Sequence, residues 1–569
     1  MSPEFPGVDG LDELAGLHEP AERQPSPLDA VCESFVYDLA ELSPTAATSW
    51  GIAGHGGELQ DFSPEYWNAI ANRNREMIAD MDALVADTSC FDDEDDTGTD
   101  CDDVDNVTAA VLRDRLCLDT SLHHNGEDIR LLNNIESPVQ TIRDTFSLMP
   151  HETAEQIDAI RARLTHVPRA LDGYKDSLAL AAAQGNVAGA RQVDAVINQC
   201  ESLAQSGSLL EGLGVDKTSS EVMDAKRAFA EFADWLSGDL APHAPHNDGV
   251  GRDRYELFSH YFVGDVVDLD EAYEWGRERL REIVSEQEKL ASQMYGCGVA
   301  EAYQRLDADD RYTLHGSDAL VEWMQGVADQ AIDDLSGTEF DISEPMRAVV
   351  ARIDQAGSGG IFYTPPSDDF SRPGQMWWSV PAGQTEFHTW QELTTVFHEG
   401  VPGHHLQLGQ ALLEPTLNLW RRLACWNSGH GEGWALYAES LMDELGYFED
   451  PGMKMGYLDS QRLRAARVVL DIGVHLGKKV PDGVGTWDAA YAKGFLRDNT
   501  AMDEANLNFE LDRYLGWPGQ APSYALGQRL WRRTRSEALA KGMSAREFHS
   551  RALSLGSVPM SVLRNEVLS

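Results

Sequence analysis

One short stretch of the chain carries four side chains that could bind a metal and catalyse hydrolysis. The segment HEGVPGHH contains His398, Glu399, His404 and His405. Imidazoles and carboxylates are the usual ligands of catalytic zinc, and a glutamate next to a ligand commonly serves as the general base. The stretch therefore predicts a metal site in which Glu399 is the catalytic base.

The spacing differs from the zinc-peptidase pattern HExxH, because Pro402 occupies the position of the second histidine. On an unbroken helix, the residue six positions after His398 lies about 120° around the axis, and the next lies about 10 Å along it. On such a helix, neither His404 nor His405 could bind the same ion as His398, because zinc lies about 2 Å from each ligand nitrogen. Because Pro402 and Gly403 can interrupt a helix, we expect a bulge that makes His404 the second ligand. His405 remains the alternative ligand, and otherwise has a catalytic role.

A third ligand is expected from a separate helix that begins near GEGWALYAE, where Glu432 is the candidate. Glu439 lies seven residues later on the same helix face and is expected to support a ligand from behind. Two histidines, one glutamate and an open position form a common catalytic zinc set. We therefore predict one Zn²⁺ per chain, with Glu399 removing a proton from water made acidic by the metal.

Longer blocks surround these residues: HEGVPGHHLQ, EGWALYAE, RAARVVLDIGVH and RYLGWPGQAPSYALGQ. They resemble the domain of unknown function 885 family, from about residue 28 to the end and most densely from about residue 360. That family is similar to zinc metallopeptidases of the gluzincin type. The resemblance implies a mostly helical, peptidase-like hydrolase.

The third block places Arg467, Asp471 and His475 on one helix stripe, where Arg467 and Asp471 could pair. Asp471 or His475 could orient a zinc ligand or bind the transition-state oxyanion. We predict a catalytic role for His475, a supporting role for Asp471 and substrate binding by Arg467. The alternative is a buried ion pair between helices.

Two further groups of residues are candidates for contacts with substrate. By similarity to helical zinc peptidases, Tyr524 could stabilise the oxyanion and Gln520 could bind substrate, although Tyr524 could also be an ordinary interface tyrosine. Two β-type runs, 359–366 and 374–380, precede the metal motif. Tyr363 in the first run would contact substrate if an edge strand pairs with a peptide. The alternative is a small structural sheet with an aromatic core.

The charge excludes several classes of function. The 569 residues include 95 acidic and 45 basic side chains, which give a formal charge of −50. Such a charge argues against binding to nucleic acid or to an anionic membrane. The favoured interpretation is a halophilic surface adapted to high salt, and the alternative is a specific acidic docking surface.

Cysteine usage and hydropathy predict a cytoplasmic location. The seven cysteines are scattered without a CxxC motif, and the first residues lack a basic segment followed by an apolar one. No stretch approaches the roughly 18 apolar residues of a membrane-spanning helix.

These features predict a mainly α-helical, zinc-peptidase-like architecture with a small β-sheet beside the metal-bearing helices. We expect a disordered segment at 1–27, a helical region at 28–245 and a metallohydrolase region at 246–569, with a cleft between the two regions. The predicted function is a zinc-dependent hydrolase that cleaves peptide bonds. The alternatives are an amidase acting on a small non-peptide substrate and an inactive helical binding protein with a structural metal. The bond cleaved and the oligomeric state stay open.

Overall fold

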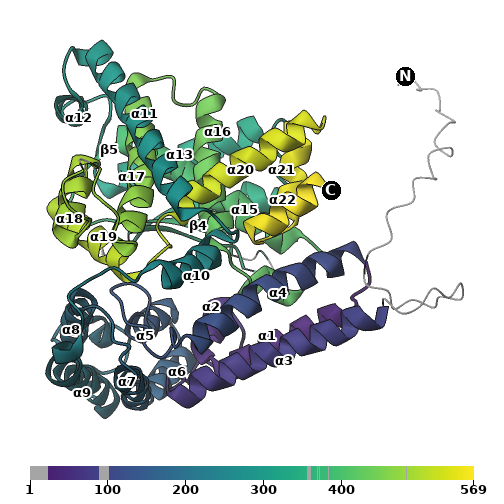
Figure 1. The fold of residues 1–569 in the computed structure, drawn as a ribbon, viewed down its shortest axis with the longest axis vertical. Helices are drawn as coiled ribbons and strands as arrows, with labels where there is room; N and C mark the ends of the chain where they lie inside the picture. The colour runs from purple at the N-terminus through teal and green to yellow at the C-terminus, as the bar shows by residue number, and fades with distance from the viewer. Residues whose placement is uncertain are drawn as a thin grey trace, which may run out of the picture.

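The computed structural model describes residues 23–88, 102–354, 360–367, 370, 372–381, 383–481 and 483–569. In this part of the chain, helices dominate and two small sheets complete the fold (Figure 1). The prediction of a mainly helical protein with small sheets is confirmed. Most of the predicted disordered segment 1–27 lies outside the described residues.

Three long helices run side by side at one edge of the molecule, and shorter helices gather at their far end (Figure 1). The first long helix starts with a capping box, in which Ser26 and Asp29 each accept a hydrogen bond from the other's backbone N–H. The helices of this half are α1 (Pro27–Leu42), α2 (Pro44–Trp50), α3 (Pro64–Thr88), α4 (Asp103–His124), α5 (Pro138–Leu148), α6 (Ala154–Leu164), α7 (Val167–Ala183), α8 (Ala190–Ala204) and α9 (Ser220–Trp235).

The second half holds the strands and the remaining helices. The helices are α10 (Arg252–Val263), α11 (Leu269–Tyr295), α12 (Val299–Asp307), α13 (Ser317–Leu335), α14 (Thr389–Glu399), α15 (His404–Leu413), α16 (Ser428–Glu444), α17 (Pro451–His475), α18 (Ala489–Asp498), α19 (Glu504–Gly516), α20 (Ser523–Ala540), α21 (Ala545–Ser554) and α22 (Met560–Leu568). The strands are β1 (Thr313–His315), β2 (Val349–Asp354), β3 (Ile361–Thr364), β4 (Gly374–Ser379) and β5 (Glu386–His388).

The two halves share the largest apolar core. Phe35 of α1, Met77 of α3 and Val111 of α4 belong to the same buried cluster as Trp434 of α16 and Phe548 of α21. A second core lies wholly within residues 62–244. The long helices α1, α3 and α4 are therefore fastened to the C-terminal half, while α5–α9 mainly pack on one another.

Glycines let the helices of the C-terminal half approach very closely. A Cβ added to Gly527 of α20 would lie 2.2 Å from the carbonyl oxygen of Gly429 in α16, and one on Gly433 would lie 2.6 Å from the backbone of Gly527. A Cβ on Gly456 of α17 would lie 1.6 Å from the carbonyl oxygen of Trp390 in α14. Helices α14, α16, α17 and α20 are thereby held in a tight group.

The larger sheet is attached to this helical group. Its order is β2-β4-β3, with β2 parallel and β3 antiparallel to β4, and β3 and β4 match the two predicted β-type runs. The Trp378 indole of β4 donates a hydrogen bond to Glu392 of α14 (2.8 Å). The smaller sheet pairs β1 with β5, and β5 leads directly into α14.

Candidate metal centre

The break between α14 and α15 determines where the side chains of His398 and His404 point. Helix α14 ends at Glu399, the Val401–Pro402 bond is cis, and α15 begins at His404. The backbone N–H of Gly403 donates to the carbonyl of Phe397 (3.0 Å). The predicted bulge is therefore a complete break between two helices.

Glycine and tryptophan stabilise this break. A Cβ at Gly403 would lie 1.9 Å from the carbonyl oxygen of His398, so no larger residue fits. The buried Trp434 of α16 donates its indole N–H to the carbonyls of Pro402 (2.9 Å) and Gly403 (3.2 Å). The turn is thus held against the helix that carries Glu432.

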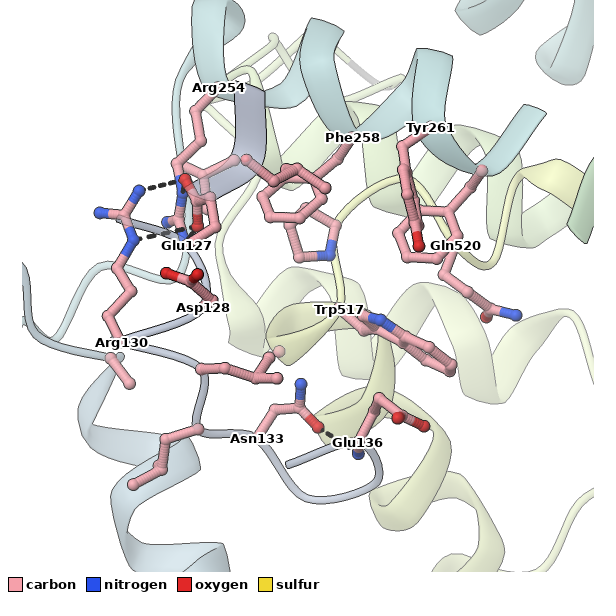
Figure 2. Close-up of a pocket in the computed structure, with 18 of the residues that line it drawn as sticks. Glu127, Asp128, Arg130, Asn133, Glu136, Arg254, Phe258, Tyr261, Trp517 and Gln520 are labelled. Carbon is pink, nitrogen blue, oxygen red and sulfur yellow. Dashed lines mark hydrogen bonds and ion pairs between the residues drawn. The ribbon is translucent and has the colours of Figure 1, made fainter. Parts of the chain in front are cut away.

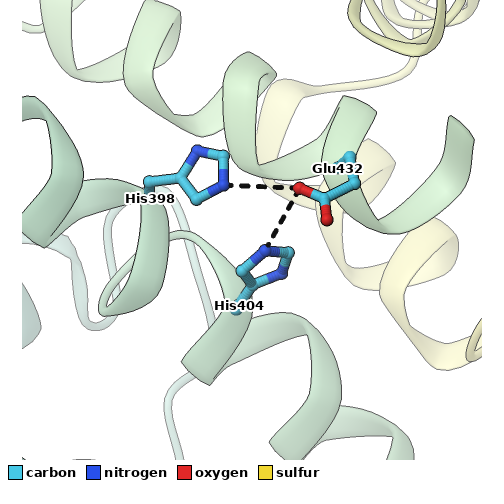
Figure 3. A group of neighbouring side chains, drawn as sticks. All are labelled: His398, His404 and Glu432. Carbon is cyan, nitrogen blue, oxygen red and sulfur yellow. Dashed lines mark ion pairs between the residues drawn. The ribbon is translucent and has the colours of Figure 1, made fainter. Parts of the chain in front are cut away.

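His398, His404 and Glu432 converge in space (Figure 3). The Nε2 atoms of His398 and His404 lie 3.5 Å and 3.6 Å from Glu432 Oε2, and the three ligand atoms lie within 4.8 Å of one another. Ligands around tetrahedral zinc are separated by about 3.3 Å if each bond is about 2.05 Å. Direct hydrogen bonds between these atoms would be shorter, at about 2.7–3.2 Å. The spacing therefore fits an ion between them.

The protonation of this cluster is set by its carboxylates. Burial lowers the pKa of His398, but Glu432 and Glu439 outweigh this effect and raise it to about 10. Burial works against ionisation of Glu432, yet the neighbouring His398 and His404 hold its pKa well below the usual range. A metal that binds here must therefore displace a proton from His398.

Glu439 holds His398 from behind, as expected for a supporting carboxylate. It accepts a hydrogen bond from His398 Nδ1 (2.7 Å) and another from Thr394 (2.6 Å). Ser460 and Gln461 of α17 also donate to it. Burial alone would raise the pKa of Glu439, but the bond from His398 lowers it overall. The carboxylate therefore directs Nε2 of His398 toward Glu432.

Glu399, the predicted base, is 6% exposed at the end of α14. Burial raises its pKa, against the opposing charges of His398, His404 and Arg464. A carboxylate with a raised pKa binds a proton more readily, which suits a group that must accept one from water.

His405 is directed away from the cluster, contrary to its predicted catalytic role. It is fully buried, and its Nε2 contacts the carbonyl of Met346 (2.9 Å) while its Nδ1 contacts the hydroxyl of Tyr363 (2.7 Å). Burial lowers its pKa to about 4, so the ring is neutral and both nitrogens are satisfied. Tyr363 therefore anchors β3 to α15 through His405, whose ring its hydroxyl contacts.

The predicted pair between Arg467 and Asp471 is wrong. Arg467 instead binds Glu510 of α19 (2.7 Å) and donates to the hydroxyl of Tyr514. These partners are distant in sequence, and they outcompete the neighbour one helical turn away. Arg467 thus forms the buried interhelical ion pair that was the alternative interpretation.

Asp471 and His475 also lie apart from the metal cluster. Asp471 accepts hydrogen bonds from Tyr255 (2.5 Å) and from the backbone of Gly519 (3.0 Å), and burial raises its pKa to about 7. His475 contacts the carbonyl of Tyr514 (2.9 Å) and stacks on Tyr255. None of these partners is a ligand, so the contacts of Asp471 and His475 fasten α17 to α10 and α19.

Tyr524 and Gln520, in contrast, lie on the Glu432 side of the site. Burial and the charge of Glu432 raise the pKa of Tyr524, which is 8% exposed. Arg513 donates to Tyr524 (3.2 Å) and to Gln520 (2.8 Å). Arg464 and Arg513 were not among the predicted site residues. Arg464 lies one turn before Arg467 on the same helix, and this spacing could have indicated that both side chains face the same site.

A cavity of about 770 Å³ lies between the two halves (Figure 2). Glu432 is one of the residues that line it. Arg254 closes one side through a two-bond contact with Glu127 (2.7 Å each). The side chains labelled in Figure 2 come from both halves: Glu127, Asp128, Arg130, Asn133, Glu136, Arg254, Phe258, Tyr261, Trp517 and Gln520. The position of this cavity agrees with the cleft expected between the regions.

Two solved structures share this fold. A putative lipoprotein from Colwellia psychrerythraea is 21% identical with a TM-score of 0.78, covering 95% of this chain and 98% of its own. A putative lipoprotein of unknown function from Shewanella oneidensis is 18% identical with a TM-score of 0.68, covering 96% and 100%. No curated protein matches this sequence.

The names of these two proteins contradict the predicted cytoplasmic location. That prediction was wrong because scattered cysteines and the composition of the first residues do not determine where a protein resides. Within the described ranges, no helix is long and apolar enough to cross a membrane.

The family model for bacterial proteins of unknown function, DUF885, matches residues 44–567, which is nearly the whole chain. The predicted resemblance to this family is confirmed, and the chain belongs to the DUF885 family.

Proposed function

We propose that this protein is a zinc-dependent hydrolase that cleaves peptide bonds. The observation that carries the proposal is the distance of the His398 and His404 Nε2 atoms from Glu432 Oε2, 3.5 Å and 3.6 Å. These distances are close to two edges of a zinc tetrahedron and longer than direct hydrogen bonds. The same arrangement supports a likeness to gluzincin-type peptidases, with a helical, zinc-peptidase-like architecture.

The residues around the cluster suit this chemistry. Bound zinc would supply Lewis acidity, which polarises a carbonyl and lowers the pKa of water. Glu399 accepts the proton of the attacking water and passes it to the leaving amine. Tyr524 lies near Glu432, where its hydroxyl can donate a hydrogen bond to the developing oxyanion. Glu439 keeps His398 in place throughout.

The cavity supports a substrate larger than a single amino acid. Its volume of about 770 Å³ lies in the range of small-molecule sites. Aromatic side chains of Phe258, Tyr261 and Trp517 combine with polar groups on its walls. Such a lining suits a short peptide, which has both apolar side chains and hydrogen-bonding backbone.

Glu399→Gln tests the proposal directly. The amide keeps the size of the side chain but cannot accept a proton, so we expect retained fold, about one zinc per chain, and a loss of turnover of about 10²–10⁴-fold. Elemental analysis measures the zinc content, and digestion of a peptide library measures the turnover. Glu444→Gln, at an exposed position of α16, is the matched control. Near-normal turnover in Glu399→Gln, or activity that survives complete chelation of metal, would contradict the proposal.

A further inference from the structure

Three arginine side chains surround the ring of Tyr524. The guanidinium carbons of Arg464, Arg467 and Arg513 lie 5.5 Å, 5.0 Å and 5.8 Å from the ring centroid. Glu510 binds two of them, Arg467 at 2.7 Å and Arg513 at 3.3 Å. Glu510 thus balances the charge of Arg467 and Arg513, whereas it makes no ion pair with Arg464 among the described residues.

Each of these arginines retains an unused donor. Among the described residues, Nε of Arg464, Nη1 of Arg467 and Nε of Arg513 are buried and have no hydrogen-bond partner. The side chain of Arg467 is only 5% exposed. Buried cationic donors without partners are costly, and an anion bound among them would relieve that cost. Arginine is also the side chain best suited to hold a carboxylate through two parallel hydrogen bonds.

This arginine group lies next to the metal cluster. Ser460 of α17 donates to Glu439, which holds His398, and Arg464 follows Ser460 by four residues on the same helix face. The charges of Glu399 and Glu439 also act on Arg464, and the charge of Glu432 acts on Tyr524. The arginine group therefore adjoins the residues of the metal cluster.

The neighbouring carboxylates of the metal cluster are already engaged. Glu439 is held by His398, and Glu432 faces both histidines. Glu399 remains near enough to Arg464 for their charges to interact. Arg464 and Arg513 are partly exposed, and Arg513 donates a hydrogen bond to Gln520, which lines the cavity together with Glu432.

We propose that Arg464, Arg467 and Arg513 form a subsite for the free C-terminal carboxylate of a peptide, so that the enzyme removes residues from the C-terminus. This inference rests on the proposed peptidase function. Tyr524 forms the floor of the subsite and separates the three guanidinium groups. Arg467 and Arg513 are fixed by Glu510, whereas Arg464 carries the donor that meets the ligand.

Binding to the zinc-loaded, inactive Glu399→Gln protein tests the subsite without turnover. The probes are N-acetylphenylalanylalanine and its C-terminal amide, compared by calorimetry. We expect the acid to bind at least about 10-fold more tightly, because hydrogen bonds to charged groups are the stronger ones. Adding Arg464→Met should reduce this ratio to less than about 2-fold with zinc content unchanged, and Arg464→Lys should recover part of it.

Arg533→Met is the matched control, because Arg533 lies in α20 at the surface and pairs with Glu537. It should keep the full preference for the acid. Equal binding of acid and amide, binding of neither, or a preference that survives Arg464→Met overturns the subsite.

The two proposals fail differently. If wild-type protein cleaves acid and amide peptides with the same kcat/KM, the hydrolase stands and the carboxylate subsite falls. If the acid binds preferentially through Arg464 but no peptide is cleaved, the carboxylate subsite is supported and the peptidase function is contradicted.

Discussion

His404 and His405 are adjacent in sequence but face different surroundings. His404 points its Nε2 at Glu432, while the nitrogens of His405 contact Tyr363 of β3 and the carbonyl of Met346, which lies just before β2. The start of α15 at His404 produces this difference, because successive residues of a helix point about 100° apart. One side chain is therefore available to a metal, and its neighbour is part of the packing.

This contrast predicts separate effects of two substitutions. His404→Ala should lower zinc affinity by far more than the roughly 10–100-fold typical of residues that only support a ligand. His405→Ala should retain zinc but lower the free energy of unfolding by about 1–3 kcal/mol, since it leaves the Met346 carbonyl and the Tyr363 hydroxyl without their partner. Chelator competition and urea unfolding measure the two quantities. Zinc loss in His405→Ala with zinc retained in His404→Ala would show that the ligand assignment is reversed.

The crossing of α16 and α20 sets the distance between Glu432 and Tyr524. Gly527→Ala would place a methyl group 2.2 Å from the carbonyl oxygen of Gly429, so the helices must separate. We expect a loss of about 1–3 kcal/mol in the free energy of unfolding, as for other overpacked contacts. Gly494→Ala in α18 meets no atom within 4 Å and is the control. It should be neutral or slightly stabilising, because alanine favours helix. Equal effects of the two changes would show that the crossing is not tight.

Local features of the sequence predicted the elements of the site but not all of its contacts. Pro402 and Gly403 indicated an interrupted helix, and the spacing of Glu432 and Glu439 placed both on one helix face. These inferences depend on neighbouring residues alone. The partnership of Arg467 with Glu510 depends on how α17 packs on α19. Helical spacing could not predict it, and the same holds for the cavity, whose walls come from both halves.

At the scale of the whole molecule, the dominant feature is a formal charge of −50. Many arginines are engaged in ion pairs, such as Arg529 with Glu271 and Arg564 with Glu537. These ion pairs neutralise the basic groups, so the acidic side chains that remain unpaired repel one another across the surface. Self-repulsion of this kind opposes the compact state.

Salt should therefore stabilise this protein. Raising the ionic strength from about 0.1 M to 1 M shortens the Debye length from about 10 Å to 3 Å, which screens repulsion between exposed carboxylates. Exposed ion pairs also weaken, but each contributes only about 0–1 kcal/mol, whereas the acidic excess acts over the whole surface. We expect Tm to rise steadily across a KCl series, measured by thermal unfolding with a protein of similar size and near-zero charge as the control. A Tm that is flat, or highest at low salt, would contradict the halophilic interpretation and favour localised acidic docking.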